Sequence, residues 1–213
     1  MNRQKLFSFV TVTGLALALA AITIAADPPK QEGGTPPPLP AGWTEADMKA
    51  MVEAGTPGKM HKFLADSAGT WAGKNTMWPA PGAPPIQSES TSVVKPLMDG
   101  RYIQLEVKGE MPGVGRYQGM GTYGFDNVTQ KFVSSWIDNM STGMMQGTGE
   151  LSPDGKTLTW QYSHSCPITK KPVAVREIEK ITGPDTRTIE MHGTDPKSGK
   201  EYKMMMIELT KKS

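Results

Sequence analysis

Clusters of turn-forming residues divide the chain after residue 68 into short segments, and this spacing limits the possible folds more than any other feature. The breaks include PAPGAPP at 79–85, MPGVG at 111–115, SPDGK at 152–156 and DPKSG at 195–199. Proline, glycine, aspartate and asparagine favour tight turns. We therefore expect ten strands between the breaks, near residues 70–78, 87–95, 101–109, 115–125, 131–139, 144–151, 156–163, 173–181, 186–193 and 201–211.

Short strands that follow one another at spacings of about 8–12 residues are typical of all-β proteins. Because successive strands are joined by hairpin-like turns, the order predicts an antiparallel meander. Closing a long meander into a barrel removes its two exposed edges. The predicted fold is thus an all-β barrel of about ten strands, and a two-sheet sandwich is the alternative that the same spacing allows.

Two short helices are expected before the strands. The segment TEADMKAMVEAG has Thr44 at the cap position, Asp47 in the capping-box position and Gly55 at the end. A second segment, PGKMHKFLADSAG, opens with Pro57 and should stop near Gly69.

The first 26 residues have the order of a secretory signal peptide. Arg3 and Lys5 precede an apolar run, and small residues follow at Ala25 and Ala26. A retained membrane anchor is the alternative, but the apolar core is short for a spanning helix. Residues 27–42 are rich in proline and glycine and predict a flexible linker. The barrel domain should occupy residues 43–213, in a periplasmic or secreted protein without stable membrane insertion.

Charge and cysteine content narrow the possible partners. Loss of Arg3 and Lys5 with the signal leaves 21 basic and 21 acidic residues. A neutral surface gives no electrostatic reason to bind nucleic acid or an acidic membrane. The single cysteine, Cys166, has no partner for an internal disulfide, so the mature domain must be held together by its core.

Alternation along the expected strands indicates which residues share a face. Arg101 begins a face that continues with Ile103 and Leu105, and Trp136 shares a face with Asp138. Several such faces are aromatic or aliphatic with one polar group near an end, which is typical of a ligand cavity. Gly119, Gly121 and Gly124 are expected to be kinks that let a barrel strand turn.

Four motifs together resemble an exported bacterial family of unknown function. They are HKFLADSAGTW (61–71), DGRY (99–102), GTYGFD (121–126) followed by WID (136–138), and SPDGKTL (152–158). The chain is similar to the domain of unknown function 1579 family over roughly residues 57–212. The resemblance implies a calycin-like barrel, related in architecture to lipocalins, in which Trp71 closes one end. It implies no particular activity.

The expected function is binding of a small hydrophobic or amphiphilic molecule inside the barrel. The predicted walls and orienting groups are Tyr123, Trp136, Tyr162, Met204 and Met206, with Arg101, Asp138 and Arg176. Asp138 is expected either to orient a ligand donor or to pair with Arg101 or Arg176, because an unpaired buried carboxylate costs several kcal/mol.

No enzyme activity is expected, because the sequence has no nucleophile elbow, metalloprotease helix motif or phosphate-binding glycine loop. No cofactor is expected either. A periplasmic copper or haem protein that uses His192 or Met191 is the alternative, since fifteen methionines are many for this length and thioethers suit Cu(I). A packed barrel that acts only through protein interactions is a third possibility.

Overall fold

The computed structural model describes residues 39–213 of the 213-residue chain. The predicted signal peptide, residues 1–26, and most of the predicted linker, residues 27–42, lie outside the described residues. In the part of the chain that is described, neither helix has both the length and the apolar character needed to cross a bilayer.

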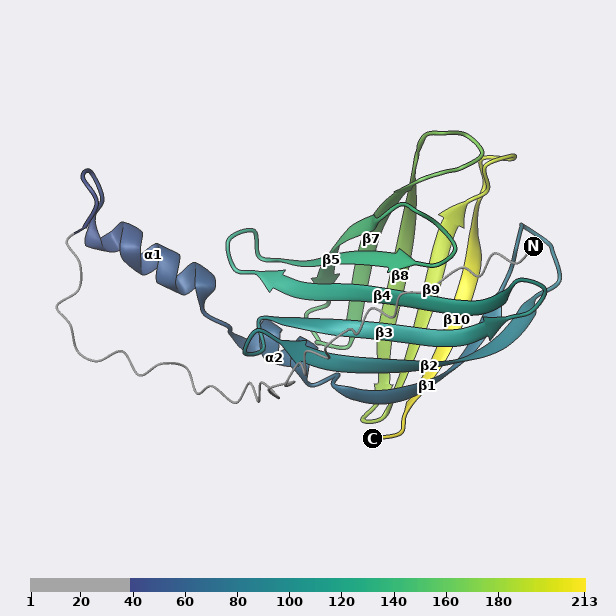
Figure 1. Cartoon of the computed structure of the whole chain (residues 1–213), viewed down its shortest axis with the longest axis horizontal. Helices are drawn as coiled ribbons and strands as arrows, with labels where there is room; N and C mark the ends of the chain where they lie inside the picture. Colours follow the sequence, from purple (N-terminus) through teal and green to yellow (C-terminus); the bar gives the residue numbers. More distant parts are fainter. Residues whose placement is uncertain (1–38) are drawn as a thin grey trace, which may run out of the picture. The chain divides into compact units, whose positions relative to one another are not determined.

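Ten antiparallel strands form one closed barrel (Figure 1). Each strand pairs with its neighbours in the sequence, and the first pairs with the last, so Trp71 lies opposite Lys211 and Met77 opposite Met205. The predicted all-β meander is therefore confirmed, and the two-sheet sandwich is wrong. The strands are β1 Gly69–Met77, β2 Ile86–Leu97, β3 Tyr102–Met111, β4 Gly115–Asp126, β5 Lys131–Asp138, β6 Met145–Leu151, β7 Thr157–Ser165, β8 Pro172–Gly183, β9 Thr186–Thr194 and β10 Glu201–Lys211.

Two short helices precede the barrel, as predicted. Helix α1, Glu45–Gly55, begins with the expected capping box between Thr44 and Asp47. Helix α2, Lys59–Ala65, is shorter than the sequence indicated and is capped by Gly58, so Pro57 lies before it. The backbone N–H of Gly58 donates to Nδ1 of His61 at 3.0 Å, which gives this buried histidine a structural role at the start of α2.

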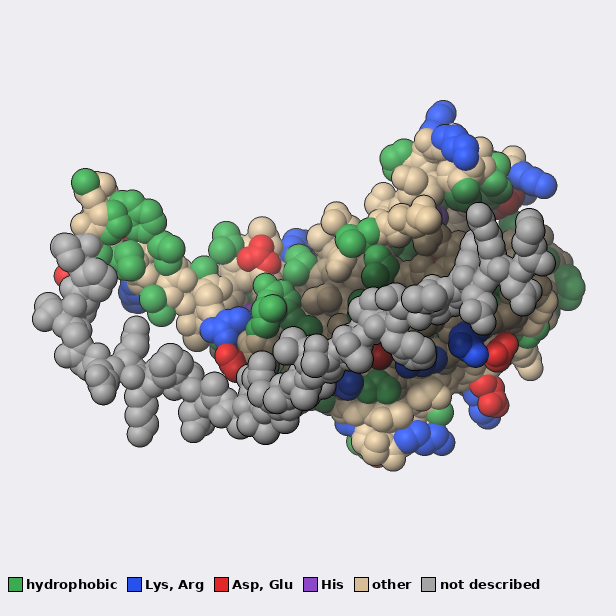
Figure 2. Space-filling view, viewed as in Figure 1, with side chains coloured by type: hydrophobic (Ala, Val, Ile, Leu, Met, Phe, Trp, Pro, Cys, Tyr) green, Lys and Arg blue, Asp and Glu red, His purple; other side chains and the backbone are tan. Residues whose placement is uncertain are grey.

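The end of α1 is bound by the turn between β4 and β5. The side-chain amide of Asn127 donates to the backbone oxygens of Glu53, Ala54 and Thr56, at 3.2, 3.2 and 2.8 Å. Backbone oxygens at the end of a helix lack the usual partner four residues further on, although that of Glu53 also accepts from the backbone N–H of Thr56. Helix α1 itself buries no residue, and hydrophobic side chains gather on its surface (Figure 2).

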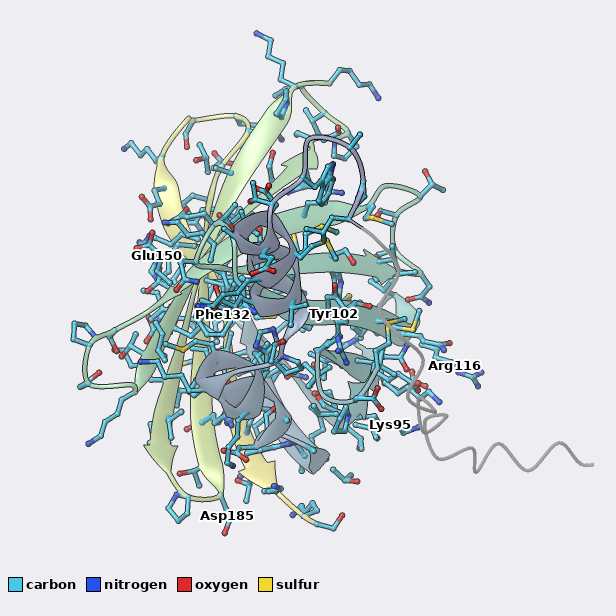
Figure 3. All side chains as sticks on the ribbon, turned by 90° about the vertical axis from the view of Figure 1, so that its left-hand side faces the viewer. Lys95, Tyr102, Arg116, Phe132, Glu150 and Asp185 are labelled. Carbon is cyan, nitrogen blue, oxygen red and sulfur yellow. The ribbon has the colours of Figure 1, made fainter. Side chains whose placement is uncertain are left out.

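Side chains alternate between the outside of the barrel and its interior. Figure 3 shows Lys95, Arg116 and Glu150 on the outside, and all three are exposed. Phe132 lies inside and is 2% exposed. This division follows the alternation of the strands, and it means that the interior is built from every second residue.

One end of the barrel is closed by α2 together with Trp71. The indole N–H of Trp71 donates to the backbone oxygen of Ser67, at 2.9 Å, just after the helix. Phe63 of α2 packs edge-on against Phe132, with ring centroids 5.9 Å apart. Trp71 is 3% exposed, which agrees with the closing role that the family resemblance implied.

Candidate ligand cavity

The barrel encloses a cavity of about 1070 Å³. Its lining comes from α2, from the inward faces of the strands and from loops at the opposite end, including Met140 and Pro167. Barrels of eight or more strands are wide enough to leave such a space. The cavity volume lies just above the range of about 300–1,000 Å³ found for small-molecule sites.

Glycines on β4 make room for an aromatic ring on β5. A Cβ atom at Gly119 would lie 2.3 Å from the Trp136 ring, and one at Gly121 would lie 2.8 Å from it. Gly121 and Trp136 are directly paired between the two strands. The pairing of β4 with both neighbours has no register shift, so these glycines accommodate the indole rather than interrupt the strand. This explains why one arm of the hairpin carries glycines and the other a tryptophan.

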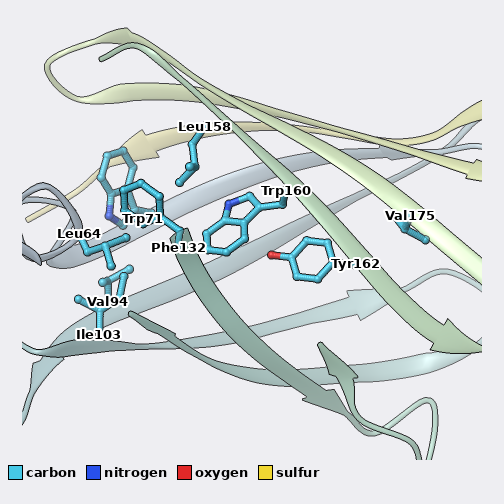
Figure 4. Close-up of a cluster of buried hydrophobic side chains, with 9 residues drawn as sticks. All are labelled: Leu64, Trp71, Val94, Ile103, Phe132, Leu158, Trp160, Tyr162 and Val175. Atoms are coloured by element: carbon cyan, nitrogen blue, oxygen red, sulfur yellow. The ribbon is translucent and has the colours of Figure 1, made fainter. Parts of the chain in front are cut away.

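The next hairpin repeats the same arrangement. Gly147 on β6 faces the ring of Tyr162, and Gly149 faces the ring of Trp160, with Cβ positions 2.3 and 2.8 Å from the rings. Trp160 and Tyr162 stack with centroids 5.8 Å apart. Figure 4 shows Phe132, Trp160 and Tyr162 following one another along the interior. Glycines thus let aromatic rings lie flat along one side of the cavity.

An acidic pair projects into the cavity from β8. Glu177 and Glu179 both line it, and Glu179 accepts a hydrogen bond from Nη1 of Arg187 on β9, at 2.6 Å. Burial raises the pKa of Glu177 to about 8, and the negative charge of Glu179 adds to this effect. Glu177 is only partly exposed, and it lies in the wall of the cavity.

Sequence reasoning missed these three charged residues. Alternation along β8 places Glu177 and Glu179 on the same face as Val175 and Ile181, whereas Arg176 and Lys180 share the other face. Two acids within the more apolar face were the available signal. The pattern was overlooked because glutamate on a strand usually indicates a solvent-exposed face.

Methionines are concentrated at the loop end of the cavity. Met77 and Met111 lie at strand ends, and the segment between β5 and β6 adds Met140 and Met144, all of which line the cavity. The flexible thioether side chain fills irregular apolar space. The methionines therefore give the loop end of the cavity a deformable apolar lining, into which a few polar groups are set.

Five of the predicted site residues line the cavity and three do not. The lining includes Tyr123, Trp136, Asp138, Tyr162 and Met204, and it does not include Arg101, Arg176 or Met206. A bulge between Lys203 and Met205 on β10 changes the alternation. As a result Met204 and Met205 both line the cavity, whereas Met206 lies on the outer face. Whether any of the five binds a ligand stays a prediction.

The predicted pairing of Asp138 with an arginine is wrong. Arg101 lies in a turn 3.6 Å from Asp99, and Arg176 is bound to Glu201 at 2.7 Å on the outside of the barrel. Asp138 instead accepts hydrogen bonds from the indole N–H of Trp136, at 3.2 Å, and the backbone N–H of Met140, at 2.9 Å. It therefore holds the Trp136 ring and the following turn in place.

Tyr117 adds a polar group beside Asp138 that sequence reasoning did not select. Burial raises the pKa of Tyr117 to about 12, and the nearby charge of Asp138 contributes. The phenol stays neutral at physiological pH, so it can offer a hydrogen bond near the loop end.

His192 and Met191 do not converge on one site. Met191 lines the cavity, whereas His192 is 3.4 Å from Glu190 and 3.9 Å from Glu201. Adjacent residues on a strand point to opposite faces, which places His192 on the outside. Among residues 39–213 there is no group of three or more histidine, cysteine, aspartate or glutamate side chains arranged to hold a metal ion.

These observations define the protein as a closed antiparallel β-barrel with an interior cavity. The sequence model of the family described as "Protein of unknown function (DUF1579)" matches residues 56–211. The chain belongs to this family, as its motifs indicated. No curated protein matches the chain.

Solved structures with the same barrel include two with low sequence identity. Rv2717c from M. tuberculosis has a TM-score of 0.57 and 14% identity, over 74% of this chain and 100% of its own. The S-type phycobiliprotein lyase CPES from Guillardia theta has a TM-score of 0.51 and 11% identity, over 76% of this chain and 97% of its own. These likenesses establish the fold alone.

The lyase corrects one expectation. The absence of familiar catalytic motifs predicted a protein that is not an enzyme, but an enzyme is among the proteins that share this barrel. Missing sequence motifs therefore do not argue against catalysis in this fold, because a barrel can supply reactive groups from several strands without any local signature.

Proposed function

We propose that the protein binds a small apolar or amphiphilic molecule inside its barrel. The observation that supports this proposal is a cavity of about 1070 Å³ that the side chains do not fill. Protein interiors are normally packed without large voids. A space of this size therefore argues against the alternative of a filled barrel that acts only through protein interactions. The lining also combines apolar walls with a few polar groups, as ligand sites do.

The glycine and aromatic pairs give further support. Trp136, Tyr162 and Trp160 lie flat against glycines of neighbouring strands, which keeps large rings at the wall and leaves the centre free. Aromatic side chains offer large apolar contact surfaces. A molecule with a flat or chain-like apolar part would therefore find extensive contact along β4 to β7.

Two matched variants test this proposal by filling the cavity or leaving it open. Val107 lines the cavity from β3, and the next residue, Lys108, is exposed on the outer face. The wild-type protein and both variants are incubated with a lipid extract of the organism that produces the protein, and are then examined by native mass spectrometry. A bound organic mass is expected in the wild type and in Lys108→Trp, and its loss in Val107→Trp. The proposal is wrong if the wild type stays empty, or if Val107→Trp binds as well as the control.

We also propose that the protein acts outside the cytoplasm, in the periplasm or as a secreted protein. The support is the order of charged, apolar and small residues over positions 1–26. Cell fractionation followed by N-terminal sequencing tests it. The mature chain should begin at Ala26 or Asp27, and an intact N-terminus in the cytoplasmic fraction would contradict it.

A further inference from the structure

Glu177 is an acid inside the barrel that has neither a counter-ion nor a hydrogen-bond donor among the side chains of residues 39–213. Glu177 and Glu179 are two residues apart on β8 and both face the cavity. The guanidinium of Arg187 is bound to Glu179, and within residues 39–213 no side chain donates a hydrogen bond to Glu177 or forms an ion pair with it. Buried carboxylates are normally paired. Glu177 is therefore a group whose partner could come from a bound molecule.

The groups that face Glu177 are aromatic, uncharged or already paired. On β7, Trp160 lies directly opposite it and Tyr162 lies one inward position further along. Tyr123 comes from β4 and packs edge-on against Trp160, with centroids 5.5 Å apart. Burial, with the charge of Glu177 as the next cause, raises the pKa of both tyrosines, so both remain neutral phenols.

The remaining neighbours come from β8 and β9. Glu179 adds a second negative charge, and its partner Arg187 lies 5.0 Å from the centre of the Trp71 ring, toward the closed end. Met191 of β9 is paired with Glu177 and carries no charge. A carboxyl group without a partner is therefore left beside aromatic rings in the middle of an apolar cavity.

We propose that Glu177, with the rings of Trp160, Tyr162 and Tyr123, binds the positively charged head of an amphiphile whose apolar part lies along the cavity. Organic cations such as amines and quaternary ammonium groups are attracted both to a carboxylate and to the faces of aromatic rings. The proposal rests on the proposed function, because it names the chemical class of the molecule that the cavity holds.

This arrangement couples binding of a cation to the release of a proton from Glu177. The raised pKa of Glu177 means that the empty protein holds a proton there at neutral pH. An arriving cation favours the ionised form and expels that proton. Affinity for a permanent cation therefore increases as the pH rises from 6 to 9, whereas affinity for an uncharged molecule with the same tail stays level.

Three probes that share the same apolar tail distinguish the proposed role of Glu177 from the broader proposal that the cavity binds an apolar molecule. Each carries a dansyl group on an undecyl chain that ends in trimethylammonium, hydroxyl or carboxylate, and binding is followed by dansyl fluorescence below the concentration at which the probes form micelles. At pH 8.5 we expect the cationic probe to bind on the order of tenfold more tightly than the hydroxyl probe. In Glu177→Gln the two should bind alike. In Glu208→Gln, which removes an exposed acid of β10, the preference should remain.

The outcomes distinguish the two proposals. Binding of the hydroxyl probe without any preference for the cation, or a preference that survives in Glu177→Gln, overturns the role of Glu177 and leaves the cavity proposal standing. Failure of all three probes to bind overturns both. The pH dependence of the wild type gives a second readout if Glu177→Gln does not fold: a level affinity for the cationic probe between pH 6 and 9 would also overturn the role of Glu177.

Discussion

Arg187 on β9 donates a hydrogen bond to Glu179 on β8 across 2.6 Å inside the barrel, and the two side chains are only 15% and 18% exposed. The same guanidinium lies over the Trp71 ring, 5.0 Å from its centre. The ion pair therefore joins two strands to the residue that closes the barrel, and it sets the charge balance at that end of the cavity.

Loss of Arg187 should destabilise the barrel. Arg187→Met leaves Glu179 in a largely buried position without its partner, and breaking a buried pair in this way costs about 3–5 kcal/mol. The double variant Arg187→Met/Glu179→Met should recover most of this loss, because no uncompensated charge remains. Urea denaturation measures the free energies, with Arg116→Met on the outer face as the control. A single variant no less stable than this control would show that the pair contributes nothing.

The glycines opposite aromatic rings should tolerate no side chain. In Gly147→Ala the new Cβ would lie 2.3 Å from the Tyr162 ring, so the ring must move or the strands must separate. Overpacking of this kind costs about 1–3 kcal/mol. Gly143→Ala is the matched control, because no atom lies within 4 Å of its Cβ position. Thermal unfolding should separate the two variants, and equal melting temperatures would contradict this account of the glycines.

The fold was predictable because turn residues and strand alternation are local signals. The clusters at 111–115 and 152–156 mark real turns, and each of the ten expected strands is present within two residues of the bounds in the structure. The start of α2 was placed too early because proline at a first helical position is common, but here Gly58 provides the cap.

The site was only partly predictable because its composition depends on register and on pairing between distant strands. Simple alternation selected Met206, and a bulge near Lys203 that the sequence does not reveal moved it to the outer face. Arg101 was selected as the first residue of a strand, but β3 begins one residue later and Arg101 remains in the turn. The partner of each charge is likewise a tertiary property, which is why Asp138 was assigned to the wrong groups.

Asn127 should control the order of helix α1 without much effect on the barrel. In Asn127→Ala the last carbonyls of the helix lose the three contacts from the β4–β5 turn, and no residue of the helix is buried against the rest of residues 39–213. We expect faster hydrogen exchange and faster proteolysis over residues 45–56, with a barrel melting temperature close to that of the wild type. Val128→Ala, which changes a 75% exposed neighbour, is the control. Equal protection of α1 in both variants would show that the helix is held by other means.

Glu177 should make the empty protein less stable as the pH rises. The ordinary pKa of a glutamate is 4.5, and burial raises that of Glu177 to about 8 in the folded protein. Between these values the folded chain retains a proton that the unfolded chain has released. Stability that is fully present below about pH 4.5 is therefore lost progressively up to about pH 8, at a rate approaching about 1.4 kcal/mol per pH unit.

Urea denaturation of the ligand-free protein at several pH values between 5 and 8 measures this contribution. The difference in unfolding free energy between Glu177→Gln and the wild type should grow steadily in favour of the variant as the pH rises, because glutamine has no proton to lose. Glu208→Gln, on the outer face, should run parallel to the wild type over the same range. A difference that stays constant with pH would mean that Glu177 ionises in the folded protein as readily as in the unfolded chain, and that the cavity gives its charge a partner after all.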